Sequence, residues 1–264
     1  MKITLYTSLL VCAIVYSSCN MNTNSNHATG NPADTTRQVV TPKLAPAIEK
    51  LLTHFKDNNN FPVVIDSAKV AGSNKGDSLG TNEVKLLAKK WVGDSLQQMI
   101  KYVLRDFYFI DSIKASGTFA KWAQSLDIGM TKLANAYALQ KIKLNDSTTV
   151  LLWALKTSSY EADPFSDVNT VYVTLLYNGI ITETSILGQL SDSGDPPSMA
   201  SGILKGTLTK EGKISIEESE EVDDIDSAKG EVARTHYDYV ITSGKIIFKG
   251  LKGIGVTQVI VKNE

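Results

Sequence analysis

Cysteine and histidine are scarce in this chain, and their scarcity excludes several kinds of site. The 264 residues include two cysteines, Cys12 and Cys19, and three histidines. Because both cysteines lie near the N-terminus, the rest of the sequence offers no thiol for a disulfide, a thiolate zinc site, an iron–sulfur cluster or a cysteine nucleophile. His236 lies in the second half of the chain, and a lone histidine without an identifiable partner is more often a surface or packing residue than a general base. No cofactor and no histidine-based metal site are predicted.

An excess of charge of either sign is also lacking. The chain has 27 basic and 28 acidic side chains and a formal net charge of −1, so it carries no global electrostatic signal for binding nucleic acid. The Gly-x-Ser-x-Gly, His-Glu-x-x-His, Gly-x-x-x-x-Gly-Lys and Ser-x-x-Lys motifs are missing from the sequence. The common serine hydrolases, zinc proteases and phosphate-loop proteins are therefore not indicated, and the chain is predicted not to be an enzyme.

The first 19 residues have the three parts of an export signal. Lys2 supplies a positive charge, residues 3–16 form an apolar run broken only by Thr4, Thr7 and Ser8, and the small pair Ser17-Ser18 precedes Cys19. The segment from Ser17 to Cys19 resembles the lipobox of bacterial lipoproteins. This resemblance implies that cleavage exposes Cys19 and that its thiol receives a diacylglycerol anchor, which would hold the protein on a membrane.

Two other interpretations of the N-terminal segment stay open. Tyr16 stands where lipoproteins normally carry leucine or another aliphatic residue, and Val15 and Ser17 also satisfy the small-residue rule for an ordinary secreted protein cut after Ser17. An uncleaved transmembrane anchor is the less favoured interpretation, because the apolar run of roughly 14 residues is shorter than the ~20 that a spanning helix needs. The predicted location is the bacterial cell envelope, at the outer membrane or a periplasmic face, with a soluble secreted or periplasmic protein as the alternative.

The sequence predicts four consecutive parts. Residues 1–18 form the signal peptide, and residues 19–43, rich in Asn and Thr and with few apolar residues, form a disordered tether. Residues 44–134 form a mainly helical part, because apolar residues recur there at helical spacing. Residues 135–264 form an antiparallel β part, and residues 44–264 as a whole are compatible with one domain.

Alternation of side chains supports the prediction of a sheet. In residues 171–177 both alternating sets are bulky, which is typical of a strand in the middle of a sheet. Asn178-Gly179 follows directly and predicts a two-residue hairpin turn, because both residues tolerate the positive φ of a type I′ turn. The fold class is therefore α+β, with N-terminal helices followed by a large antiparallel meander that forms a curved sheet, a barrel or a sandwich.

A run of carboxylates is the strongest local feature after the tether. Seven acidic side chains fall within ten residues: Glu217, Glu218, Glu220, Glu221, Asp223, Asp224 and Asp226. The favoured interpretation is a solvated loop that protects the edge of a sheet. The alternative is a calcium site that uses Asp223, Asp224 and Asp226, because hard cations bind carboxylate-rich loops, although the regular ligand spacing is missing.

Three functions from different classes remain after these exclusions. The first is a non-enzymatic envelope module, tethered to a membrane, that binds a protein or glycan partner or scaffolds a complex. The second is a carrier of a lipid or another amphiphile that uses the curved sheet. The third is a hydrolase of cell-wall polymers with two loop carboxylates about 5–10 Å apart. The first is the prediction, because it requires no chemistry that the sequence lacks.

Overall fold

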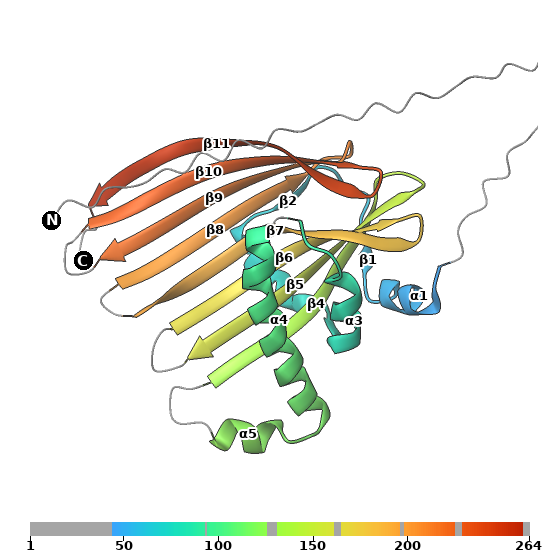
Figure 1. Ribbon diagram of the computed structural model, residues 1–264, viewed down its shortest axis with the longest axis horizontal. Helices are drawn as coiled ribbons and strands as arrows, with labels where there is room; N and C mark the ends of the chain where they lie inside the picture. The colour runs from blue at the N-terminus through green and yellow to red at the C-terminus, as the bar shows by residue number, and fades with distance from the viewer. Residues whose placement is uncertain are drawn as a thin grey trace, which may run out of the picture. The chain divides into compact units, whose positions relative to one another are not determined.

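Eight long strands joined by hairpins dominate the chain from residue 131 onward (Figure 1). The computed structural model describes residues 44–92, 94–125, 131–160, 165–195, 198–224 and 229–260. Within these residues each long strand is antiparallel to the next in chain order. The strands are β4 (Thr131–Lys143), β5 (Thr148–Tyr160), β6 (Phe165–Tyr177), β7 (Ile180–Asp195), β8 (Ser198–Leu208), β9 (Lys213–Asp224), β10 (Lys229–Thr242) and β11 (Lys245–Ile260).

Three short strands from the region before residue 80 join this sheet. They are β1 (Lys56–Asp57), β2 (Val63–Ile65) and β3 (Asp77–Leu79). β3 is antiparallel to β4, and β2 is antiparallel to β8, but β1 runs parallel to β4. The prediction of a large β-sheet is confirmed. The prediction of a purely antiparallel sheet is wrong at β1, and the barrel alternative is wrong because the sheet is not closed.

Two hairpins have turns in which two successive residues take positive φ. Asn178 and Gly179 have φ of 49° and 80°, the conformation that the sequence predicted. Ser243 and Gly244 repeat it between β10 and β11, with φ of 47° and 72°. A Cβ on Gly244 would lie 2.6 Å from Cγ of Tyr177, so glycine is also needed there for close packing against the end of β6.

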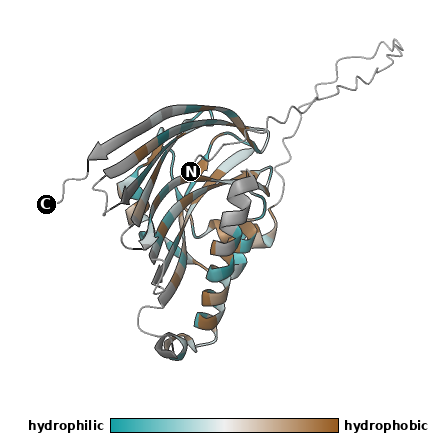
Figure 2. Cartoon of the chain, turned by 60° about the vertical axis from the view of Figure 1, so that its left-hand side comes forward, coloured by the Kyte–Doolittle hydropathy of each residue, from teal (hydrophilic) through white to brown (hydrophobic). Residues whose placement is uncertain are grey.

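Helices α1, α3 and α4 lie on one face of the middle of the sheet, and the short α2 lies on the other (Figure 1). Figure 2 shows both apolar and polar residues along the longest of them, α4, as expected for a helix with one face on a core. Its apolar side chains Leu104, Phe107 and Ile110 are buried, whereas Arg105 is exposed. The helices are α1 (Pro46–Leu52), α2 (Ser67–Ala71), α3 (Thr81–Leu87), α4 (Asp94–Ala115) and α5 (Phe119–Ser125), and η1 (Gly72–Lys75) is a 3₁₀ turn.

The central strands contribute to two separate cores, one on each face. Along β5 the side chains of Leu151 and Trp153 pack with α1, α3 and α4, and those of Val150 and Leu152 pack with β2 and α2 on the opposite face. Successive side chains of a strand point to opposite faces, so β5 is buried on both. Residues 171–176 of β6 are likewise all buried, which confirms the predicted central strand.

The sheet divides between β7 and β8, and β2 enters the division. β8 pairs with β7 as far as Leu204, but its next residues, from Gly206 to Leu208, pair with β2. At this point a Cβ on Gly206 would lie 1.9 Å from the carbonyl oxygen of Leu187, so the two backbones can cross this closely only with glycine. The division lets residues from both halves of the sheet share the apolar cluster around β2.

A buried carboxylate links the start of β7 to the start of β11. Glu183 Oε2 accepts a hydrogen bond of 2.7 Å from the Ile246 backbone N–H, and Glu183 Oε1 lies 2.7 Å from Lys90 Nζ. The first contact satisfies a buried amide, and the second pairs the buried charge. Strands that are distant in the sheet order are thereby held together.

None of the helices in the described ranges combines the length and apolar character that crossing a bilayer requires.

Candidate functional site

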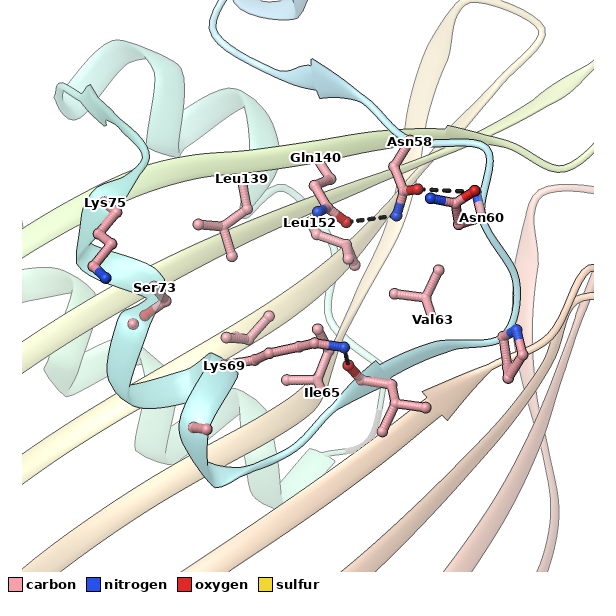
Figure 3. A pocket seen from close by; sticks show the side chains of 15 residues that line it. Asn58, Asn60, Val63, Ile65, Lys69, Ser73, Lys75, Leu139, Gln140 and Leu152 are labelled. Atoms are coloured by element: carbon pink, nitrogen blue, oxygen red, sulfur yellow. Dashed lines mark hydrogen bonds between the residues drawn. The ribbon is translucent and has the colours of Figure 1, made fainter.

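A pocket of about 530 Å³ lies between the sheet and the segment that crosses one of its faces (Figure 3). We call residues 56–75, which comprise β1, β2, α2 and η1, the strap. The sheet contributes the other side of the pocket through Leu139 and Gln140 of β4, Leu152 of β5 and Val171 of β6. Residues far apart in the sequence therefore form one cavity, of a size that suits a small ligand.

A bulge in β4 shapes the sheet side of the pocket. Ala138 pairs with Trp153 and Gln140 with Leu152, so Leu139 is an extra residue without a partner in the ladder. A bulge of this kind interrupts the alternation of faces and re-aims side chains. Leu139 and Gln140, although adjacent, consequently both line the pocket, as Figure 3 shows.

Side-chain amides hold the first part of the strap against β4. The Asn58 backbone N–H donates to the Lys141 carbonyl at 3.0 Å, and Asn58 Nδ2 donates to Gln140 Oε1 at 2.8 Å. Asn58 Oδ1 also accepts from the Asn60 backbone N–H at 2.9 Å. These bonds fix a polar corner at one end of the pocket.

A buried polar cluster anchors the other end of the strap to β6. Asn169 Nδ2 donates to the Val70 carbonyl at 2.7 Å, and Ser73 Oγ lies 2.7 Å from the same carbonyl and 3.0 Å from Asn169 Oδ1. Asp66 caps α2 by accepting from the Lys69 backbone N–H at 3.0 Å. The Ser73 hydroxyl is thus committed to structural contacts with Val70 and Asn169.

The pocket combines an apolar floor with a polar and cationic rim. Val63, Ile65, Leu152 and Val171 are buried floor residues and belong to the apolar cluster around β2. The rim carries carboxamides and two lysines, Lys69 and Lys75, and the residues that line the pocket include no Asp, Glu, His, Cys or Tyr. Such a lining can bind and orient a molecule that has an apolar and a polar part.

Compared with known proteins, the chain matches no family model, no curated protein and no solved structure. A function is therefore inferred below from the geometry of the sites alone.

The acidic run does not form the predicted loop. Residues 213–224 are strand β9, which pairs with β8 on one side and with β10 on the other. Alternation places Glu218 and Glu220 on one face of the sheet and Glu217 and Glu221 on the other, which halves the density of charge on each face. The prediction of an edge-protecting loop is thus wrong for residues 217–224. A strand can carry this many carboxylates because alternation divides them between the two faces of the sheet.

The predicted site residues are only partly within the described chain. Cys19 and Asp226 lie outside the described residues. Asp223 and Asp224 are the last two residues of β9. Among the described residues no group of three or more His, Cys, Asp or Glu side chains is arranged to hold a metal ion.

His236 has partners that sequence reasoning missed. Its Nε2 lies 3.0 Å from Asp238 Oδ1 and 3.1 Å from Ser215 Oγ. Asp238 is two residues along the same strand and pairs with Ser215 across the ladder, so alternation and register bring the three side chains together. A nucleophilic relay needs the acid and the nucleophile on different ring nitrogens, whereas both contacts here use Nε2, so the cluster does not have the geometry of a triad.

A smaller hollow of about 220 Å³ is lined by two carboxylates, which the hydrolase alternative requires. Glu218 and Glu220 line it together with small residues of β7 and β8. Glu218 accepts a 2.6 Å hydrogen bond from the Tyr237 hydroxyl, and burial together with this contact raises the pKa of Tyr237 to about 12. The two carboxylates are neighbours on one strand face and do not flank a substrate from opposite sides, which disfavours glycoside hydrolysis.

Proposed function

We propose that this protein is a non-enzymatic binding module of the bacterial envelope, which holds a small amphiphilic molecule in the pocket under the strap. The single observation that carries the proposal is the lining of that pocket, apolar on its floor and rich in amide and ammonium groups at its rim. Small-molecule sites have this composition, with a mostly apolar surface and a few polar groups that orient the ligand. The proposal combines two of the functions considered above: the protein is a binding module, as predicted, and its ligand is an amphiphile, as in the carrier alternative.

The pocket offers a direct test of this function at Gly72. A Cβ on Gly72 would meet no atom within 4 Å, although the residue lines the pocket, and its φ of −82° suits any L-residue. We expect Gly72→Leu to fill the cavity without destabilising the fold. The neutral fluorophore N-phenyl-1-naphthylamine should bind the wild type with enhanced emission, and Gly72→Leu should raise its Kd about tenfold or more.

The matched control for this test is Gly250→Leu on β11. A Cβ on Gly250 would likewise meet nothing within 4 Å, but this residue does not line the pocket. Its substitution should leave the Kd of the fluorophore within about twofold of the wild type. Equal binding by the wild type and by Gly72→Leu, with both proteins folded by circular dichroism, would rule out the pocket as the site.

We also propose that the module is held at a membrane through a lipid on Cys19. The support is the resemblance of the preceding segment to a lipobox and the position of the cysteine directly after it. Cys19→Ser should move the protein from the membrane fraction to the soluble fraction of cells, because the acyl chains provide the anchor. Unchanged partitioning of the variant would count against lipidation.

A further inference from the structure

The charged side chains that line the pocket are of one sign. Lys69 and Lys75 both line it, and neither forms an ion pair with a carboxylate in the described part of the chain. The strap's own carboxylates, Asp57 and Asp66, do not line the pocket and have other partners. Asp66 caps α2, and Asp57 lies 3.5 Å from Lys141 Nζ. The rim is therefore a cationic site whose counter-charge is not supplied by the residues that line it.

The two chemical parts of the pocket lie next to each other. Figure 3 shows Lys69 reaching from α2 toward β2, where its ammonium group donates to the Val64 carbonyl, and Leu139 and Leu152 on the sheet side of the pocket. Gln140 uses its carbonyl oxygen to accept from Asn58, and in the described structure its NH₂ group donates to no protein atom. An anion at the rim could therefore accept from a lysine ammonium or from this carboxamide, while a chain attached to it would lie on the apolar floor.

From this arrangement we infer that the ligand of the pocket is a single-chain amphiphile with an anionic head group, either a carboxylate or a phosphate. The inference rests on the proposed function, since it names the ligand class of the same pocket. Charge-assisted hydrogen bonds to an anion are about twice as strong as neutral ones, so Lys69 and Lys75 should contribute most of the binding free energy of the head group. A cationic amphiphile of the same chain length would meet two like charges and no carboxylate among the lining residues.

Displacement of the bound fluorophore tests the head-group charge. Decanoate, decyl phosphate and decyltrimethylammonium share one chain length and are titrated separately against the wild-type protein loaded with N-phenyl-1-naphthylamine. Decanoate or decyl phosphate should displace it at a concentration about tenfold or more below that of decyltrimethylammonium. The stronger of the two anions identifies the carboxylate or the phosphate as the head group. Added salt should weaken the anions, because screening reduces their attraction to the lysines.

Lysine variants connect this preference to the pocket. Lys69→Gln and Lys75→Gln should each raise, severalfold, the concentration of the tighter-binding anion that is needed to displace the fluorophore. The double variant should bind this anion no better than decyltrimethylammonium, while the neutral fluorophore still binds. Lys249→Gln on β11, an exposed lysine outside the pocket, is the control and should change nothing.

The outcomes separate the two proposals. If Gly72→Leu leaves the Kd of the fluorophore unchanged, the proposed binding site is wrong. If Gly72→Leu blocks the fluorophore but the anions and the cation compete equally in the wild type, or the double lysine variant keeps the preference, then the site stands and the anionic ligand class is overturned.

Discussion

Trp153→Ala should cost about 3–5 kcal/mol of the free energy of unfolding, the range for removing a large aromatic side chain from a well-packed core. Trp153 is fully buried on the helix-covered face of β5. Its ring stacks on Tyr172 with centroids 4.5 Å apart and lies 6.4 Å from the ring of Trp91. Truncation would leave a cavity where the strands meet the helices, and the surrounding strands cannot close it because both of their faces are occupied.

The indole of Trp153 also starts a chain of buried polar contacts. Its Nε1–H donates to Thr174 Oγ1 at 2.9 Å, Thr174 and Thr184 hydroxyls lie 2.9 Å apart, and Thr184 Oγ1 donates to the Leu87 carbonyl at 2.6 Å. Removal of the indole leaves the buried Thr174 hydroxyl with one hydrogen-bond partner fewer, which lowers the free energy of unfolding further.

Urea denaturation measures this effect, with Phe109→Ala on α4 as a control for loss of an aromatic ring. Phe109 is 53% exposed, so its removal should cost much less than removal of Trp153. Equal losses for the two variants, or a loss below about 1 kcal/mol for Trp153→Ala, would show that this core does not hold the sheet and helices together.

Gly206→Val should be the second severely destabilising change, at about 3 kcal/mol or more. The new Cβ would lie 1.9 Å from the Leu187 carbonyl oxygen, and this neighbour is backbone that cannot rotate away. Strands β7 and β8 would have to separate at the place where Gly206 pairs with Ile65 of β2. Because β2 is part of the strap, the substitution should also weaken binding in the pocket.

The control for this variant is Gly250→Val, since a Cβ at that position on β11 meets nothing within 4 Å. It should change the unfolding free energy by about 0.5 kcal/mol at most, as surface substitutions usually do. A Gly206→Val protein with the stability and fluorophore affinity of the control would contradict the described crossing of the two backbones.

Local signals in the sequence were sufficient for the central hairpin. Asn178-Gly179 predicted both the turn and its conformation, because few residue pairs accept positive φ at two successive positions. The bulky run in residues 171–177 predicted a strand buried on both faces, and β6 is that strand. The sequence could not predict that β2 enters the sheet beside β8, because nothing in three residues of strand specifies a partner more than a hundred residues away.

The pocket could not be predicted from the sequence for the same reason, because local sequence does not specify contacts between distant segments. Local patterns predict only that the strap belongs to a mainly helical part, residues 44–134, whereas the sheet side of the pocket comes from β4, β5 and β6. The bulge at Leu139 depends on how β4 pairs with β5, which periodicity does not reveal. The acidic run was misassigned because its composition suggested a loop, whereas its alternation is compatible with a strand exposed in part on both faces.

Photo-crosslinking tests the central claim, that the strap and the sheet enclose the binding site, most directly. A decanoate analogue with a diazirine at the end of its chain is irradiated with the wild-type protein, and the labelled peptides are identified by mass spectrometry. The label should attach to the strap, between residues 63 and 75, or to the segments around Leu139, Leu152 and Val171, and unlabelled decanoate should suppress it. Suppressible label concentrated on β11 or α4, with none on the strap or those three segments, would contradict the account.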